Sequence, residues 1–332
     1  MKSIETRAVK SSMKYSKGLQ DLGGGCYAWM QPDGSWGWSN AGLVVGAGSS
    51  LVVDTLFDLV AAREMLNGVS SLTTTSPLST VVNTHSDPDH YFGNQIFATP
   101  GVEIISSTAA AEMISQEAVQ ELIAIKQAGG RVGDFARTIF EPFVFDDITV
   151  TPPTRTFHGK LSVDVGGREV VLIEVGPAHT VGDVLVHVPD SRLMYTGDIL
   201  FVGATPVVWS GPPERWIETL DRLLDMPLTR FVPGHGAVTN KTGVSEVRDY
   251  LQFVNTEATR RFEHGMSVDA AITSIKLGRF AEMSEHSRLA QNVAAVFYAL
   301  DPDMPRRPRM QTFDKMAELE GFSHSTAVHK SS

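Results

Sequence analysis

The sequence predicts a mixed α/β protein built as one large domain with an appendage. Short apolar, β-branched segments such as residues 170–175 alternate with longer segments of helical spacing such as residues 57–66. Several of the short segments run directly into His or Asp. The length of 332 residues is enough to bury a large core.

Composition excludes some classes of partner and of site. The formal net charge of −10 argues against a nucleic-acid binder, because phosphate contacts need clustered Lys and Arg. Cys26 is the single cysteine in the sequence, so an intramolecular disulfide and a cysteine-based zinc site are both excluded. A metal site must therefore use His and Asp.

The apolar segments are short. The first residues lack the continuous apolar stretch of a secretory signal, and no apolar run approaches the ~20 residues that span a bilayer. We therefore expect a cytoplasmic protein that acts on a small molecule and has no membrane partner.

The N-terminal third reads as an arm followed by strands and a helix. Residues 1–24 are polar and end in a run of glycines, which predicts a loosely attached arm. Asp54 or Thr55 is available to cap the first helix. The expected elements are strands at 26–31 and 36–45 joined by a turn at 32–35, a strand at 51–54 and a helix at 57–66.

The remaining elements follow the same reading of periodicity and turn residues. Residues 128–153 look like an insertion, and we expect the tail from residue 301 to be extended and available to a partner. The expected strands are 81–84, 155–165, 168–175, 184–188 and 193–196, and the expected helices are 91–97, 107–127, 214–224, 244–262, 268–276 and 286–300.

Four candidate metal ligands follow the strand at 81–84 within six residues. They are His85, Asp87, Asp89 and His90. One short loop could present two pairs of ligands to two adjacent metal ions, an arrangement typical of dinuclear hydrolytic sites. The alternative is a polar turn before a helix.

Three later segments each end a strand with one candidate ligand. They contain His179 in Gly-Pro-Ala-His-Thr-Val-Gly-Asp, Asp198 in Tyr-Thr-Gly-Asp, and His235 in Val-Pro-Gly-His-Gly. With the loop at 85–90 and the strand-end Asp54, these motifs resemble the metallo-β-lactamase superfamily over residues 25–240. The signature of that family is His-x-His-x-Asp-His, then a lone His, a Gly-Asp and a Gly-His.

The resemblance implies a fold and a set of ligands. The fold would be a four-layered αβ/βα sandwich over residues 25–240, with a helical extension and tail at 241–332 that forms a lid or an oligomer contact. Asp54 and Asp183 would steady the ligands from behind. The first metal would be held by His85, Asp87 and His179, the second by Asp89, His90 and His235, with Asp198 between them.

One ligand departs from the family signature, because Asp87 stands where the second His is usual. A third carboxylate lowers the positive charge of the site and favours harder cations. We therefore expect two divalent ions, zinc foremost, with manganese or iron as alternatives. If Asp87 points away from the site, a single metal remains.

The resemblance implies a metal-dependent hydrolase in which a metal-bound hydroxide attacks the substrate. Asp89 or a water handles the proton, and Asp198 bridges the metals. The substrate would be small and partly apolar, with an ester, lactone, thioester or activated aryl-ether bond. Trp36, Trp38 and Trp209 are candidate pocket residues, and no anion clamp is evident.

Two other functions stay open. An iron-dependent oxidoreductase can use the same fold, and Asp87 makes an oxygen-rich iron site conceivable. A non-catalytic subunit that binds a related catalytic chain is the other, and we expect either a homo-oligomer or such a hetero-oligomer. His158 is interpreted as structural because its neighbours match no ligand motif.

Overall fold

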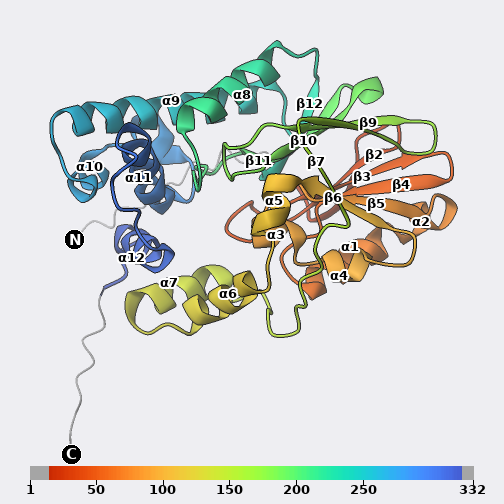
Figure 1. Ribbon diagram of the computed structural model, residues 1–332, viewed down its shortest axis with the longest axis horizontal. Helices are drawn as coiled ribbons and strands as arrows, with labels where there is room; N and C mark the ends of the chain where they lie inside the picture. Colours follow the sequence, from red (N-terminus) through yellow and green to blue (C-terminus); the bar gives the residue numbers. More distant parts are fainter. Residues whose placement is uncertain (1–14, 324–332) are drawn as a thin grey trace, which may run out of the picture.

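Two β-sheets packed face to face carry helices on their outer sides, in the computed structural model that describes residues 15–323 (Figure 1). The predicted αβ/βα sandwich with a C-terminal helical part is confirmed. The first sheet has seven strands and the second has five.

The seven-stranded sheet follows chain order from β1 to β7. The pairs from β1 to β4 are antiparallel, and the pairs from β4 to β7 are parallel. Its strands are β1 Gly18–Asp21, β2 Cys26–Met30, β3 Ala41–Gly46, β4 Ser49–Val53, β5 Leu78–Val82, β6 Glu103–Ser107 and β7 Arg155–Phe157.

The five-stranded sheet has the order β12-β11-β10-β9-β8, and only its β11–β12 pair is parallel. Both candidate ligands Asp198 and His235 lie in that parallel pair. The strands are β8 Lys160–Asp164, β9 Glu169–Glu174, β10 Val184–Val188, β11 Leu193–Phe201 and β12 Arg230–His235.

Side-chain alternation along each strand produces the layers. In β4, Leu51 and Val53 belong to the core between the sheets, whereas Val52 packs toward helix α1 (Leu59–Gly68). In β11, Tyr195 faces the inter-sheet core and Met194 packs in the cluster that includes helices α8 and α9. Each sheet therefore needs a helical layer on its outer face.

The helices fall into three groups (Figure 1). Helices α1 and α4 pack on the outer side of the first sheet, α8 and α9 on that of the second. Helices α6, α7 and α12 gather at one end, where α12 lies against α7. The remaining bounds are α2 Ser70–Thr75, α3 Pro88–Tyr91, α4 Asn94–Phe97, α5 Thr108–Met113, α6 Glu117–Gln127, α7 Gly130–Phe140, α8 Pro213–Asp225, α9 Lys241–Glu263, α10 Val268–Ser274, α11 Leu289–Leu300 and α12 Arg309–Leu319, with 3-10 turns at Pro189–Ser191, Gly278–Glu282 and His286–Arg288.

The predicted N-terminal arm and hairpin differ from the structure. Gly18–Asp21 is strand β1, paired with β2, so this part of the arm is not loosely attached; residues 1–14 lie outside the described residues. The predicted strand 36–45 begins only at Ala41. Residues 31–40 form a loop instead, because the Asn40 side chain bonds to Gln31 N at 3.1 Å and to Pro233 O at 3.0 Å.

Two predicted helix features were wrong in detail. The cap of α1 is Asp58, whose carboxylate accepts from Ala61 N at 2.8 Å, rather than Asp54 or Thr55. The single helix expected at 107–127 is two helices, α5 and α6, separated at residues 114–116. The side chain of Gln116, between the two helices, binds the backbone of Ile148 and Val150.

Two further boundaries differ. The strand predicted at 155–165 splits at residues 158–159 into β7 and β8, which belong to different sheets. The strand predicted at 193–196 is longer, because β11 extends to Phe201 beside the parallel strand β12.

The C-terminal tail is not extended throughout. Residues 309–319 form α12, which buries Phe313, Met316 and Ala317 against the body of the protein. No helix in the described part of the chain is both long and apolar enough to cross a membrane.

Candidate metal centre

The four ligands of the 85–90 loop follow β5, whose apolar residues Val81 and Val82 are buried in the sheet. The strand ends at Val82, and Pro88 begins the short helix α3. His85 and Asp87 therefore lie on the turn, while Asp89 and His90 lie in the first turn of the helix. The change from strand to helix turns the two pairs in different directions.

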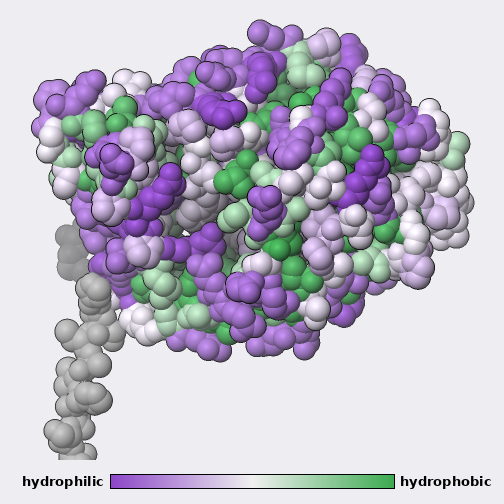
Figure 2. All heavy atoms as spheres, viewed as in Figure 1, coloured by the Kyte–Doolittle hydropathy of each residue, from purple (hydrophilic) through white to green (hydrophobic). Residues whose placement is uncertain are grey.

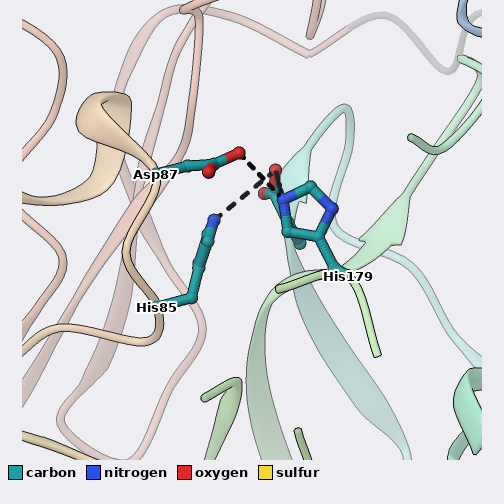
Figure 3. Close-up of side chains that lie close together, drawn as sticks. His85, Asp87 and His179 are labelled. Atoms are coloured by element: carbon teal, nitrogen blue, oxygen red, sulfur yellow. Dashed lines mark hydrogen bonds and ion pairs between the residues drawn. The ribbon is translucent and has the colours of Figure 1, made fainter. Parts of the chain in front are cut away.

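The first group consists of His85, Asp87 and His179 together with Asp198, with one ligand atom of each within 4.8 Å of the others. The Nε2 atom of His179 lies 3.0 Å from Asp87 Oδ2 and 3.4 Å from Asp198 Oδ2. Figure 3 shows the side chains of His85, Asp87 and His179 pointing toward one another. Asp87 thus faces the cluster, which removes the reason for expecting a single metal.

The second group consists of Asp89, His90 and His235. Asp89 Oδ2 lies 3.2 Å from His235 Nε2 and 3.9 Å from His90 Nε2. Asp198 lies between the groups, with Oδ1 3.0 Å from His90 Nε2 and Oδ2 3.4 Å from His235 Nε2. The carboxylate of Asp198 therefore faces both sets of ligands.

Two glycines allow this close approach. A Cβ atom at Gly234 would lie 1.9 Å from Asp198 Oδ1, and one at Gly197 would lie 2.4 Å from Thr84 Oγ1. Only glycine fits at either position. This is the physical reason for glycine before both His235 and Asp198.

The donor set fits divalent cations. Nε2 of His85, Nε2 of His90 and Oδ1 of Asp198 are buried and make no hydrogen bond of acceptable geometry, although His90 Nε2 and Asp198 Oδ1 lie 3.0 Å apart. Buried polar atoms are almost always satisfied, so a convergent group without partners needs a ligand. Imidazole nitrogens and carboxylate oxygens are donors for zinc, manganese and iron.

Asp54 supports the second group from behind. Its Oδ2 accepts hydrogen bonds from His90 Nδ1 and Thr84 Oγ1, both at 2.8 Å, and its Oδ1 accepts from Thr84 N at 2.8 Å. Because a carboxylate can only accept, Nδ1 of His90 carries the proton and Nε2 is left to face the cluster. Thr84 was not singled out in the sequence, since a threonine at a strand end has no distinctive pattern.

Asp183 stabilises the loop that carries His179. It accepts from Thr180 Oγ1 at 2.8 Å, from Thr180 N at 3.1 Å and from Ala178 N at 3.2 Å. The loop that carries His179 is therefore closed on itself by one buried carboxylate. Asp183 makes no hydrogen bond to the His179 imidazole, whose Nδ1 donates to Val207 O at 2.7 Å.

The Val207 carbonyl is itself held from α11. Asn292 Nδ2 donates to Pro206 O, and Val208 N donates to Asn292 Oδ1, both at 2.8 Å. Gln291 adds a bond to Val208 O at 2.9 Å. Sequence reasoning missed these amides, because nothing in the pattern of a buried helix links it to a loop some eighty residues earlier.

Charges within the cluster shift several pKa values. Burial would raise the pKa of Asp87, but the positive charge and hydrogen bond of His179 outweigh burial and hold it at about 2. Burial opposes protonation of His179, yet the Asp87 carboxylate raises its pKa to about 9. Burial and the neighbouring His90 lower the pKa of His85 well below its usual value. His179 and Asp87 therefore form an ion pair at neutral pH.

A cavity opens beside the cluster. Asp87 and Asp89 lie on its lining, together with Trp36 and Trp209. Trp38 does not line it and packs instead on Phe143, with ring centroids 4.7 Å apart. The other lining residues are Gly37, Phe57, Pro88, Leu122, Ile125, Phe140, Arg309 and Phe313.

His158 lies apart from the cluster. Its side chain is 76% exposed, and its nearest acidic partner is Glu174 at 3.8 Å. His158 belongs to neither group of candidate ligands.

Comparison with known proteins identifies the family. Residues 34–235 match the model of the metallo-beta-lactamase superfamily. The chain is 27% identical over 191 residues to the 2,4-dinitroanisole O-demethylase subunit alpha of Nocardioides sp. (strain JS1661), covering 56% of this chain and 48% of that protein. It is 23% identical to the linear primary-alkylsulfatase of Pseudomonas sp. (strain ATCC 19151), covering 68% of this chain and 48% of that protein.

Among solved structures, the stereoselective inverting sec-alkylsulfatase from Pseudomonas sp. aligns with a TM-score of 0.69 at 17% identity, over 92% of this chain and 55% of that one. The chain thus spans about half the length of the relatives it matches. The family match extends from the loop before β3 to His235 and includes every candidate ligand. This chain belongs to the metallo-β-lactamase superfamily.

Proposed function

We propose that this protein is a metal-dependent hydrolase that cleaves an ester, lactone, thioester or activated aryl-ether bond in a small, partly apolar substrate. One observation carries the proposal: two groups of His and Asp ligands meet at Asp198, and an aromatic-walled cavity opens onto Asp87 and Asp89. The alkylsulfatase and O-demethylase relatives support a small-molecule substrate.

Two divalent cations would fit the two groups, with zinc foremost and manganese or iron as alternatives. His85, Asp87 and His179 would hold one ion, Asp89, His90 and His235 the other, and Asp198 would contact both. When bound, such ions supply Lewis-acid polarisation of the substrate oxygen and lower the pKa of water.

Asp89 is the residue we assign to proton transfer. Its side chain is 14% exposed and lines the cavity, whereas that of Asp198 is 4% exposed. A carboxylate at the cavity wall can take a proton from an attacking water and pass it to the leaving group. Asp198 is too enclosed for that role and positions the ligand histidines.

The aromatic walls exclude water and orient the substrate. Trp36 and Trp209 lie with ring centroids 6.4 Å apart at the cavity. An apolar group held there would place its polar bond toward Asp87 and Asp89. Among the proposed bonds, the activated aryl ether gains support from these aromatic walls and from the O-demethylase relative.

We assign catalysis to residues 25–240 and substrate enclosure to residues 241–332. Helix α12 contributes Arg309 and Phe313 to the cavity, and α11 holds the loop behind His179. The catalytic part thus depends on the helical extension for both pocket and ligand orientation.

The test is metal content per chain, measured with hydrolysis of a panel of esters, lactones, thioesters and aryl ethers. The proposal requires close to two equivalents of metal and metal-dependent cleavage of at least one of the four bond types. Oxygen uptake with bound iron would instead favour the oxidoreductase. Activity that arises only after a second protein is added would favour the alternative of a partner subunit. The O-demethylase relative is itself a subunit, which supports testing this alternative.

A further inference from the structure

Arg309 brings a positive charge to the wall of an otherwise aromatic and acidic cavity. Among the residues that line the cavity within the described chain, Arg309 alone is cationic. It is the first residue of α12, and its guanidinium lies 5.4 Å from the ring centroid of Trp209. Asp87 and Asp89 line the same cavity, and the charge of Arg309 contributes to lowering the pKa of Asp87.

The present partner of Arg309 is easily replaced. Its Nη1 lies 3.0 Å from Oε2 of Glu121 on α6, and the two side chains are 40% and 41% exposed. Exposed ion pairs contribute little to stability, because water screens the charges and ordering the long side chains costs entropy. A ligand anion that enters the cavity can therefore displace Glu121 at little cost.

We propose that the cavity binds substrates with an aromatic ring that bears an anionic group such as a carboxylate, and that Arg309 pairs with that anion. This inference rests on the proposed function, since it names the substrate class of the same site. The ring packs against Trp36 and Trp209, the scissile bond faces Asp87 and Asp89, and the anion faces Arg309. Arg309 is thus a specificity-determining residue.

Binding of a ring requires α12 to adjust. The cavity holds about 50 Å³, whereas a cavity of about 150 Å³ accommodates benzene in a well-studied case. Phe313 lines the cavity beside Trp36, with the two ring centroids 6.0 Å apart, so a shift of Phe313 would enlarge the cavity. Because Phe313 lies one helical turn after Arg309, the two side chains share a face of α12 and move together.

The junction of α12 with the rest of the protein is partly open. Figure 2 shows the surface hollowed where α11 and α12 meet the sheet-bearing part. Arg131 of α7 holds α12 through Asp314, at 2.7 and 2.5 Å, and through Glu318 at 3.3 Å. The end that carries Arg309 is held to α6 by the exposed pair with Glu121, and Arg307 just before it pairs with Asp269 at 2.8 Å. The proposal requires this end of α12 to shift when a ring binds.

Two substitutions distinguish a role of Arg309 in binding an anion from a role in stabilising the position of α12. Arg309→Gln and Glu121→Gln both break the α6–α12 ion pair, so a stabilising role predicts the same effect for both. Recognition predicts opposite effects, because Glu121→Gln frees Arg309 for the ligand. Arg307→Gln is the matched control, since Arg307 pairs with Asp269 and does not line the cavity.

The first readout is binding to the metal-loaded protein by calorimetry, with phenol and meta-hydroxybenzoate as probes. Arg309→Gln should weaken meta-hydroxybenzoate about tenfold, as expected for a lost charge-assisted bond, and leave phenol within about twofold. Glu121→Gln should tighten meta-hydroxybenzoate. Equal binding of the two probes to the wild type overturns the proposal, as does unchanged carboxylate binding in Arg309→Gln, which means that the anion binds elsewhere, such as at the metals.

The second readout is kcat/KM for phenyl acetate and meta-acetoxybenzoate. Arg309→Gln should lower kcat/KM for the carboxylated ester alone, mainly through KM. If Arg309→Gln and Glu121→Gln each lower kcat/KM equally for the two esters, the Arg309–Glu121 ion pair only stabilises the position of α12, and the proposal is overturned. If the wild type cleaves neither ester, the assigned hydrolysis of esters fails, while the binding measurement still decides whether Arg309 recognises the anion.

Discussion

The carbonyl oxygen of Val207 fixes the orientation of His179, since it lies 2.7 Å from Nδ1 and can only accept a hydrogen bond. Nδ1 therefore keeps its proton when the imidazole is neutral, and Nε2, directed at Asp87 and Asp198, is the nitrogen that can bind a metal. Partners of this kind tune the affinity of a histidine for metal.

Asn292→Ala should reduce metal affinity at the group that contains His179. Asn292 bonds to the backbone on both sides of Val207, so its loss lets the carbonyl turn away from the imidazole. We expect a loss of about tenfold or more in affinity for one of two ions. Chelator competition and the absorption spectrum of the cobalt-substituted protein measure it. Gln291→Ala, which removes one bond to Val208, is the control and should have a smaller effect.

Asp87→Ala should lower the metal content toward one equivalent per chain. Asp87 supplies a carboxylate oxygen 3.0 Å from His179 Nε2, and alanine offers no donor there. Asp87→His, which restores the residue usual in the family signature, should keep two equivalents and shift preference toward zinc. Elemental analysis decides, and unchanged stoichiometry in Asp87→Ala would show that this carboxylate is not a ligand.

Asp198→Asn should damage both metal content and activity far more than His158→Ala. Asp198 faces histidines of both groups, whereas His158 is on the surface. We expect a loss of at least about a hundredfold in kcat for Asp198→Asn, as is common when charge stabilisation is removed from an active site. His158→Ala should retain activity near that of the wild type. Similar losses in both variants would contradict the placement of Asp198 between the two groups of ligands.

pH should affect metal affinity and the stability of the metal-free protein in opposite directions. The pKa of His179 is raised from 6.5 to about 9 beside Asp87, so its pairing stabilises the fold fully below pH 6.5 and is lost as pH rises through about 9. A metal must displace this proton, so apparent affinity should rise by up to about tenfold per pH unit toward pH 9. Urea unfolding of the metal-free protein and chelator titrations across this range measure the two trends. A flat affinity profile would show that His179 loses no proton on binding.

The strands that lead to the candidate ligands follow from local sequence. The strand ending at Val82 and the turn that follows it are predicted by adjacent residues, because β-branched residues favour strands and Pro favours a turn or helix start. The sandwich fold and the grouping of His179, Asp198 and His235 with the loop at 85–90 were predicted from the resemblance to the superfamily signature.

What could not be predicted depends on partners distant in the chain. Residues 36–40 were predicted to begin a strand, yet Asn40 donates hydrogen bonds to the carbonyl oxygens of Pro233 and Gly236 and keeps them in a loop. The splitting of 155–165 between two sheets depends on which neighbouring strands are available, since periodicity is the same in either sheet. The helical α12 follows a proline-rich connection, and its helix is stabilised by packing of Phe313 rather than by an obvious sequence signal.

The contact between Trp36 and Phe313 joins residues from nearly opposite ends of the described chain. During synthesis, every ligand of the cluster has emerged once β12 is complete, and Asn292 follows before the connection at 301–308. The wall formed by Arg309 and Phe313 is added last. A nascent or proteolytically shortened chain that ends within 301–308 would therefore contain the candidate ligands and Asn292 but lack Arg309 and Phe313. Under the proposed function, such a chain would bind metal before the residues that select the substrate are present.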